Sequence, residues 1–174
     1  MSGRRVKVPV GVIRPSMDQM RESVFACLGD LSGRSFLDLF AGSGIIALEA
    51  ASRGALYIEA VENDPLKRKT LLQNVSVSPV RINCRFISSE LYVQKARRLF
   101  DYIFLDPPFS YRYKWDLLER IAVSPLVSVE SIILLHRPLE DDPKELLDPL
   151  LDHVDSREYG RSIVDFYKVK TETE

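Results

Sequence analysis

The chain has 174 residues, of which 45% are hydrophobic, 28% charged and 9% aromatic, and its formal net charge at pH 7 is −1. This length is that of one ordinary domain, and the composition excludes disordered, collagenous and low-complexity chains. No apolar run approaches the roughly 18 to 20 residues that a membrane-spanning helix needs, and the polar first seven residues contain no apolar signal core. We therefore expect a cytoplasmic protein that does not contact a membrane.

Apolar runs of strand length alternate with segments of helical pattern, which favours βαβ units and a mostly parallel sheet. The predicted helices cover residues 16–28, 44–53, a segment that begins at 64–65, 89–98, 114–123 and 144–150. The predicted strands cover residues 35–40, 57–62, 82–87, 101–105, 131–135, 152–159 and 162–170. The last two strands are joined at Gly160 and are close enough to form an antiparallel hairpin.

The first helix has an apolar face made of Met17, Met20, Val24, Cys27 and Leu28. Cys27 and the second cysteine, Cys84, stand alone in apolar surroundings, without the spacing of a zinc site. We expect both cysteines in the core and no bound metal.

A glycine loop follows the first predicted strand, with the sequence LDLFAGSG at residues 37–44. Glycine allows the backbone to approach a ligand closely, and the free N–H groups of the next helix favour a carboxylate or a phosphate. Glu62 comes twenty residues after Gly42, at the end of the second strand, where a carboxylate can accept both hydroxyl hydrogens of a ribose. Together they indicate an adenosine-containing cofactor, either a nicotinamide nucleotide or S-adenosylmethionine.

The string Asp106-Pro107-Pro108-Phe109 directly follows the fourth predicted strand. The two prolines stiffen the loop and remove backbone donors, so the Asp106 carboxylate and the Pro107 carbonyl stand as acceptors without a competing N–H. Ligands of open α/β sheets bind outside the carboxyl ends of the strands, which places this string beside the glycine loop. The pattern favours recognition of a planar –NH2 group.

These strings resemble those of class I S-adenosylmethionine-dependent methyltransferases with a (D/N)PP(F/Y/W) motif, which act on exocyclic amino groups. The resemblance is closer to the bacterial small-subunit ribosomal RNA guanine-N2 methyltransferase D family, and it runs over nearly the whole chain. It is carried by RPS at 14–16, RESVF at 21–25, DLFAGSG at 38–44, LEA at 48–50, RG at 53–54, END at 62–64, DPPF at 106–109, YG at 159–160 and FY at 166–167.

The resemblance implies a Rossmann-like class I methyltransferase fold, which has a mostly parallel seven-stranded sheet and a C-terminal antiparallel hairpin. It implies one methyltransferase domain over residues 16–174 after a basic arm at 1–15. The catalytic residues that it implies are Asp106, Pro107, Pro108 and Phe109, around the target amine. The cofactor-binding residues are Asp38, Phe40, Ala41, Gly42, Ser43, Gly44, Glu62, Asn63 and Ser88. Within that set, Asp38 and residues 42–44 face the methionine end, and Glu62 faces the ribose.

The basic arm is the expected contact with RNA. Basic side chains outnumber acidic ones in residues 1–29, whereas residues 139–159 have eight acidic side chains against two basic ones. The acidic segment is interpreted as a solvated helix face. We expect Arg4, Arg5, Lys7 and Arg14 to contact phosphates, although the arm lacks the preceding strand with paired glycines that the family has.

Two further positions depart from the family pattern. Where members usually have an acid or amide after the third strand to receive the adenine amino group, this chain has Ser88 and Ser89, and Ser88 can accept that bond. Where the fifth strand often ends in an acid, this chain has His136, which we interpret as an ordinary strand-end histidine rather than a base.

The expected reaction is methyl transfer to guanine N2 in small-subunit (16S) ribosomal RNA, free or in an assembling small subunit, by a monomer. An adenine-N6 or protein-amide methyltransferase shares the same acceptor chemistry, and a non-catalytic RNA- or protein-binding module would not bind S-adenosylmethionine. A nicotinamide dehydrogenase is disfavoured because 174 residues leave no room for a substrate domain. A cytosine-C5 methyltransferase is disfavoured because neither cysteine lies beside the fourth-strand loop.

Overall fold

The computed structural model describes residues 15–141 and 149–171. The predicted phosphate contacts Arg4, Arg5, Lys7 and Arg14 lie outside these residues. The helix expected at 144–150 also lies outside them, except for residues 149 and 150, which form a turn.

Within the described residues, seven strands form one sheet in the order β3-β2-β1-β4-β5-β7-β6. The strands are β1 (Ser35–Asp38), β2 (Tyr57–Val61), β3 (Ile82–Arg85), β4 (Tyr102–Leu105), β5 (Ile132–Pro138), β6 (Leu151–Tyr159) and β7 (Ser162–Val169). Strands β1 to β5 are parallel to their neighbours in that group, whereas β7 is antiparallel to both β5 and β6. The predicted sheet and its C-terminal hairpin are therefore confirmed.

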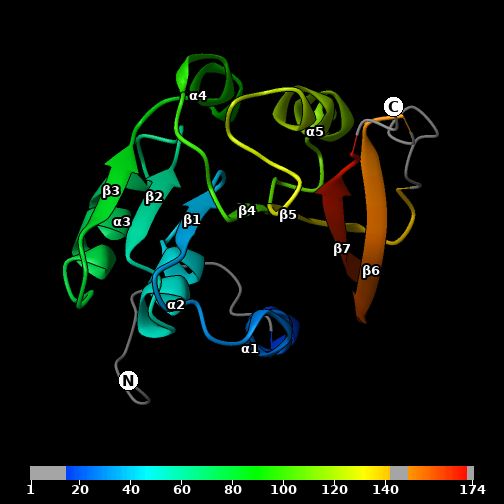
Figure 1. The fold of residues 1–174 in the computed structure, drawn as a ribbon. Coiled ribbons are helices and arrows are strands. Elements are labelled where there is room, and N and C mark those ends of the chain that lie inside the picture. Colours follow the sequence, from blue (N-terminus) through cyan, green and yellow to red (C-terminus); the bar gives the residue numbers. More distant parts are fainter. Residues whose placement is uncertain (1–14, 142–148, 172–174) are drawn as a thin grey trace.

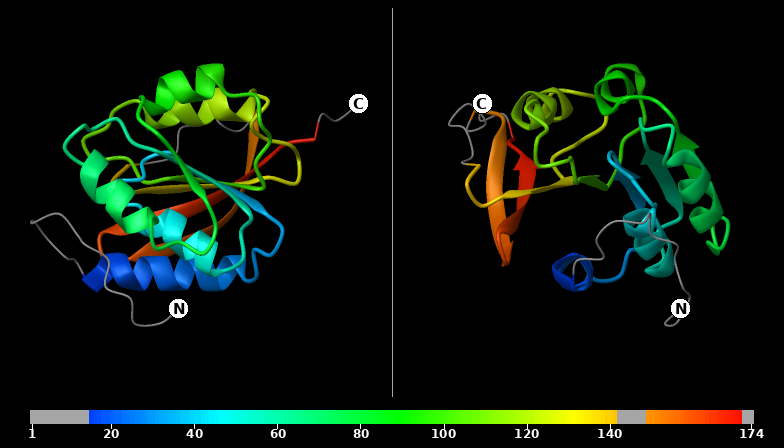
Figure 2. Two further views of the ribbon diagram at one scale, coloured as in Figure 1. Left: turned by 90° about the vertical axis from the view of Figure 1, so that its left-hand side faces the viewer. Right: turned by 180° about the vertical axis from the view of Figure 1, so that it is seen from behind.

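Helices cover both faces of the sheet. They are α1 (Pro15–Leu28), α2 (Ile45–Ser52), α3 (Arg68–Val75), α4 (Ser89–Lys95) and α5 (Lys114–Ala122). Helices α1, α2 and α3 lie on one face, and α4 and α5 lie on the other (Figure 1). The side view in Figure 2 shows the sheet between these two helical layers. This three-layer arrangement buries both faces of the parallel strands, which explains their continuous apolar sequences.

Each face of the sheet has its own apolar core. On the α1 side, the rings of Phe25 and Phe36 are stacked with their centroids 5.7 Å apart. On the α5 side, fully buried Leu117 and Leu118 belong to one cluster with Leu135 of β5. The two cores hold the strands in place, so the loops at the strand ends start from fixed positions.

The prediction that both cysteines are buried is wrong for Cys27, which is exposed, and Cys84 is only half-buried. Phe25 takes the core position on α1 because its ring stacks on the sheet, and this turns Cys27 outward. Met17 is also 38% exposed, so the buried face of α1 is narrower than predicted. Cys84 lies on β3, an edge strand with a neighbour on one side only.

Candidate active site

The candidate site lies at the carboxyl ends of the parallel strands, between β1 and β4. From this point the sheet continues through β2 and β3 in one direction and through β5 in the other (Figure 1). Such a switch point leaves a crevice outside the strand ends, where ligands of open α/β sheets bind. The glycine loop follows β1, Glu62 follows β2, and Asp106 follows β4. The structure thus brings these three predicted elements to the same edge of the sheet.

The loop after β1 is a tight turn that two glycines make possible. The Gly44 N–H donates to the Ala41 carbonyl at 2.7 Å, and Gly42 and Gly44 have φ angles of 54° and 82°. These left-handed angles are costly for residues with a side chain. A Cβ at Gly44 would also lie 2.6 Å from Cδ1 of Leu71 on α3. Glycine at 44 therefore lets α3 pack closely against the turn at the start of α2.

Glu62 links the glycine turn to the end of β2. Its Oε2 accepts a hydrogen bond from the Gly42 N–H at 2.7 Å, and its Oε1 accepts one from the Asp64 N–H, also at 2.7 Å. The side chain is buried. Each carboxylate oxygen can accept a second hydrogen bond, so Glu62 has capacity for ribose hydroxyls while it holds the turn.

Asp38, at the end of β1, is a fully buried carboxylate without a counter-charge. Neither side-chain oxygen has a hydrogen-bond partner among the described residues. The pKa of Asp38 is raised to about 8, first by burial and then by the negative charges of Asp106 and Glu62. The backbone N–H groups of Phe40 and Ala47 oppose this shift without reaching hydrogen-bond geometry.

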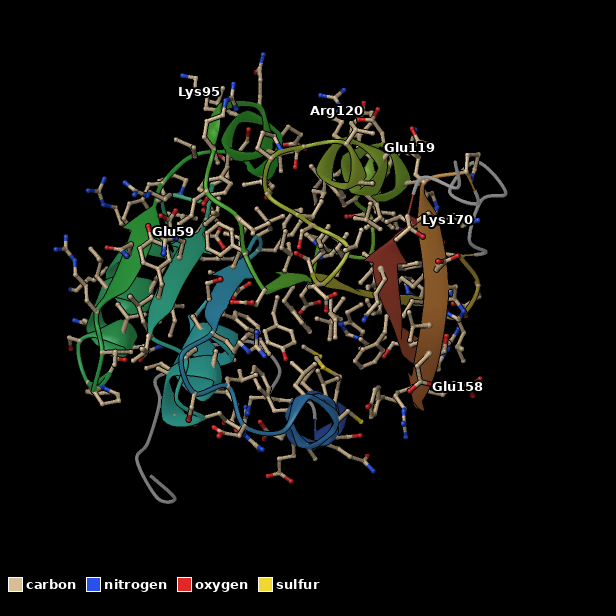
Figure 3. The ribbon with its side chains drawn as sticks, viewed as in Figure 1. Glu59, Lys95, Glu119, Arg120, Glu158 and Lys170 are labelled. Carbon is tan, nitrogen blue, oxygen red and sulfur yellow. The ribbon has the colours of Figure 1, made fainter. Side chains whose placement is uncertain are left out.

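A second buried carboxylate on the sheet shows how unusual Asp38 is. Glu59 on β2, labelled in Figure 3, accepts hydrogen bonds from the hydroxyls of Tyr57 and Tyr92 and forms an ion pair with Arg85. Buried carboxylates are normally paired in this way. The unpaired oxygens of Asp38, beside two other acids, therefore indicate a place for a cationic group such as the ammonium of an amino acid.

Ser88 and Asn63 are the other predicted cofactor contacts. The Ser88 hydroxyl caps α4 by accepting the Leu91 N–H at 3.2 Å, so part of its capacity is used within the fold. Its neighbour Ser89 is buried and donates to the Leu39 carbonyl at 2.5 Å. Asn63 is exposed next to Glu62. Ser88 and Asn63 thus both follow strand ends at the site's edge of the sheet.

The loop after β4 presents an acid and an aromatic ring. Pro107 is buried, and the Tyr111 N–H closes a turn on the Pro108 carbonyl at 2.8 Å. The Asp106 side chain is 21% exposed, and Phe109 is 43% exposed. A rigid loop with an accessible carboxylate next to an accessible ring is suited to hold a flat, amine-bearing group.

Two residues of the site were not identified from the sequence. Nδ1 of His136 lies 2.8 Å from Oδ1 of Asp106, and its Nε2 lies 2.8 Å from the hydroxyl of Ser162. The interpretation of His136 as an ordinary strand-end histidine did not anticipate this contact. The sequence offered one signal. His136 is a polar residue at the end of the most apolar run of the chain, and that run is the next predicted strand after the one that precedes Asp106.

Over residues 15–141 and 149–171, no group of three or more His, Cys, Asp or Glu side chains is arranged to hold a metal ion. No helix in the same residues has the length and apolar character that crossing a membrane requires.

The sheet order and the site at its switch point define the architecture of class I methyltransferases. Residues 1–168 match the family described as "Conserved hypothetical protein 95". The chain is 30% identical over 175 residues to the Bacillus subtilis protein named "Putative rRNA methyltransferase YlbH", a match that covers 95% of this chain and 94% of the relative. It is 27% identical over 143 residues to the ribosomal RNA small subunit methyltransferase D of Escherichia coli, covering 80% and 72% of the two chains.

A solved structure titled "Putative methyltransferase yhhF from Escherichia coli" has the same fold, with a TM-score of 0.85, 23% identity and coverage of 97% and 93% of the two chains. The chain belongs to the family of the ribosomal RNA small subunit methyltransferase D proteins. Its methyl donor is accordingly S-adenosylmethionine.

Proposed function

We propose that the protein methylates the exocyclic N2 amine of a guanine in small-subunit ribosomal RNA, as a cytoplasmic monomer that uses no metal ion. The observation that carries the proposal is the pairing of a free Asp106 oxygen with the exposed Phe109 ring on a proline-stiffened loop. The names of the relatives from B. subtilis and E. coli support ribosomal RNA as the substrate. Guanine N2 comes from the resemblance of the sequence to the guanine-N2 family.

The residues at the ends of β1 and β2 fit the methyl donor. Asp38 would accept hydrogen bonds from the donor's ammonium group, which would supply the positive charge that this buried carboxylate lacks. Glu62 would accept the ribose hydroxyls, and residues 40–44 would bring backbone close to the methionine end. Ser88 and Asn63 would complete the contacts near the adenosine. S-adenosylmethionine supplies a methyl group on a cationic sulfonium, and its transfer breaks the methyl carbon–sulfur bond and leaves a neutral thioether.

The residues after β4 would hold the target amine. The lone pair of an aromatic amine is delocalised into the ring, so its orientation toward the methyl carbon decides the rate. Asp106 and the Pro107 carbonyl would accept the two amine hydrogens and stabilise the positive charge that develops on nitrogen. Once nitrogen has bonded to the methyl carbon, Asp106 would accept the proton that nitrogen loses. Phe109 would stack on the base, which would be unstacked from its neighbours to reach the loop.

The grip on RNA is assigned to the basic arm, residues 1–15, which precedes the methyltransferase domain of residues 16–174. Arg4, Arg5, Lys7 and Arg14 would contact phosphates, which position an RNA without reading its sequence. The balanced net charge of the chain makes this segregated cluster the strongest candidate for such contacts.

The proposal is tested by methylation with isotope-labelled S-adenosylmethionine. Naked 16S ribosomal RNA and small subunits from a strain that lacks the gene serve as substrates, followed by nucleoside digestion and mass analysis. We expect N2-methylguanosine in reactions with the wild type and far slower formation of it with Asp106→Ala. N6-methyladenosine would assign the chain to the adenine-N6 alternative. Failure to bind S-adenosylmethionine in calorimetry would instead favour a non-catalytic module.

A further inference from the structure

His136 is held at both ring nitrogens. It stands on β5, which lies between β4 and β7 in the sheet (Figure 1). Nδ1 lies 2.8 Å from Oδ1 of Asp106, and Nε2 lies 2.8 Å from Oγ of Ser162. Only 2% of the side chain is exposed. The ring therefore has one orientation, fixed by polar contacts on both sides.

The hydrogens of these contacts can be placed by counting donors. Ser162 has a single hydroxyl hydrogen and two acceptors in reach, Nε2 of His136 and the Tyr159 carbonyl at 3.1 Å. If Ser162 donates to Nε2, the neutral ring has its hydrogen on Nδ1. If Ser162 donates to Tyr159 instead, Nε2 bears a hydrogen and donates it to Ser162. Nδ1 then also bears a hydrogen, because an ionised Asp106 can only accept. In both arrangements Nδ1–H donates to the Asp106 carboxylate.

This donation leaves the two oxygens of Asp106 in different situations. Oδ1 is fixed by His136, whereas Oδ2 has no hydrogen-bond partner among the described residues. A carboxylate fixed at one oxygen has a fixed plane, and its second oxygen then has a fixed direction. His136 also contacts Phe109, since the two rings meet edge to face at 5.4 Å.

We propose that His136 is a positioning residue for methyl transfer: its Nδ1–H holds Asp106 so that Oδ2 faces the target amine, and Ser162 holds the ring. The proposal rests on the proposed function, because it assigns the free oxygen of Asp106 to the amine. His136 is 30 positions from Asp106 in the chain and touches neither the donor nor the base in this assignment.

Charged groups surround the contact between His136 and Asp106. Asp106 faces the ring from the loop after β4, and Asp38 on β1 interacts electrostatically with Asp106. Arg137, the next residue of β5, is paired with Asp165 of β7.

Two substitutions separate the contacts of the ring. In His136→Asn the amide nitrogen can take the place of Nδ1 and keep the bond to Asp106. In His136→Gln the longer side chain places its amide nitrogen where Nε2 was. The hydrogen bond to Ser162 is then kept and the hydrogen bond to Asp106 is lost. We expect His136→Asn to keep most of the wild-type kcat and His136→Gln to lower it by about 10- to 100-fold, the scale of a misplaced reacting group, with both KM values unchanged.

The controls distinguish positioning from packing. In an Asp106→Ala background, His136→Gln should cause no further loss, because the residue through which His136 acts is absent. Equal kcat values for the Asn and Gln variants, or an undiminished effect of His136→Gln without Asp106, would overturn the proposal. Thermal unfolding checks that both variants fold.

A measurement without catalysis keeps this proposal separate from the proposed function. Nitrogen-15 NMR of the histidine rings should show a hydrogen on Nδ1 of His136, and this signal should shift in Asp106→Asn. A neutral ring with its hydrogen on Nε2 alone would overturn the positioning contact, whatever the substrate is. A wild type that methylates no nucleoside, with the Nδ1–H signal intact, would instead refute the proposed function.

Discussion

The amide nitrogen of Gly42 and Oε2 of Glu62 lie 2.7 Å apart, so one hydrogen bond joins the glycine turn after β1 to the end of β2. The two residues are twenty positions apart and come from different loops. The same carboxylate also accepts the Asp64 N–H. Glu62 therefore shapes the cofactor site in addition to offering acceptors to a ribose.

Replacing Glu62 by alanine should weaken binding of S-adenosylhomocysteine, measured by calorimetry. The change removes a charged acceptor, and hydrogen bonds to charged groups are each worth about 1.5 to 3 kcal/mol. The expected loss is about 10- to 100-fold in affinity. Glu158→Ala is the matched control, because Glu158 is exposed on β6, at the opposite end of the sheet from β2 and β3 (Figure 3). Unchanged affinity in Glu62→Ala would remove this residue from the ribose.

Asp38 should make binding of the donor's product release a proton. The pKa of Asp38 is raised to about 8 by burial, with the charges of Asp106 and Glu62 adding to the effect. At pH 7 the free protein therefore holds a proton on Asp38, and an incoming ammonium group expels it. Calorimetric binding of S-adenosylhomocysteine in two buffers of different ionisation enthalpy measures this release. Identical heats in both buffers would contradict the pairing of Asp38 with an ammonium.

The same residue should lower the stability of the free protein as pH rises. The pKa of Asp38 is higher in the folded than in the unfolded chain, so the folded state binds more protons between about pH 4 and 8. The contribution of Asp38 to the free energy of unfolding therefore falls across this window and becomes constant above it. Asp38→Asn should be more stable than the wild type at pH 8.5 and differ little at pH 4 in urea titrations. If the wild type is less stable than Asp38→Asn by a larger amount at pH 4 than at pH 8.5, the pH dependence has the opposite sign and contradicts this prediction.

The basic arm is expected to make RNA binding strongly dependent on salt. Each phosphate contact contributes a slope of about 0.7 to 0.9 to the fall of log K with log salt concentration. Charge reversal at Arg4, Arg5, Lys7 and Arg14 should weaken binding to 16S ribosomal RNA and flatten this slope, in filter-binding titrations. Affinity for S-adenosylhomocysteine should not change. If both affinities fall together, the arm acts on the cofactor site instead.

Much of the fold was predictable because the apolar runs of a parallel sheet are long and are separated by glycines and prolines. The helix expected from residues 64–65 starts later, at Arg68. The Asp64 carboxylate and carbonyl accept the N–H groups of Leu66 and Lys67, so the chain makes a turn first. Propensity alone does not reveal such a local competition for backbone donors.

The contact between His136 and Asp106 could not be predicted, because it depends on register. Leu105 pairs with Leu135 between β4 and β5, so the residues that follow them come side by side. Without the order and register of the strands, two residues thirty positions apart have no reason to be associated. The unpaired state of Asp38 was hidden for the same reason, since burial and missing partners are properties of the packed sheet.

Asp106 and Phe109 should make separable contributions to methyl transfer. Asp106→Ala removes an acceptor at the amine and should lower the single-turnover rate by roughly 100-fold or more, as when one preorganised charge-stabilising group is lost. Phe109→Ala removes stacking and should mainly weaken capture of the RNA, whereas Phe109→Tyr keeps the ring face and should be tolerated. Affinity for S-adenosylhomocysteine should change little in all three, since both side chains are assigned to the substrate. A near-normal rate in Asp106→Ala would end the amine-acceptor mechanism and leave this loop a structural turn.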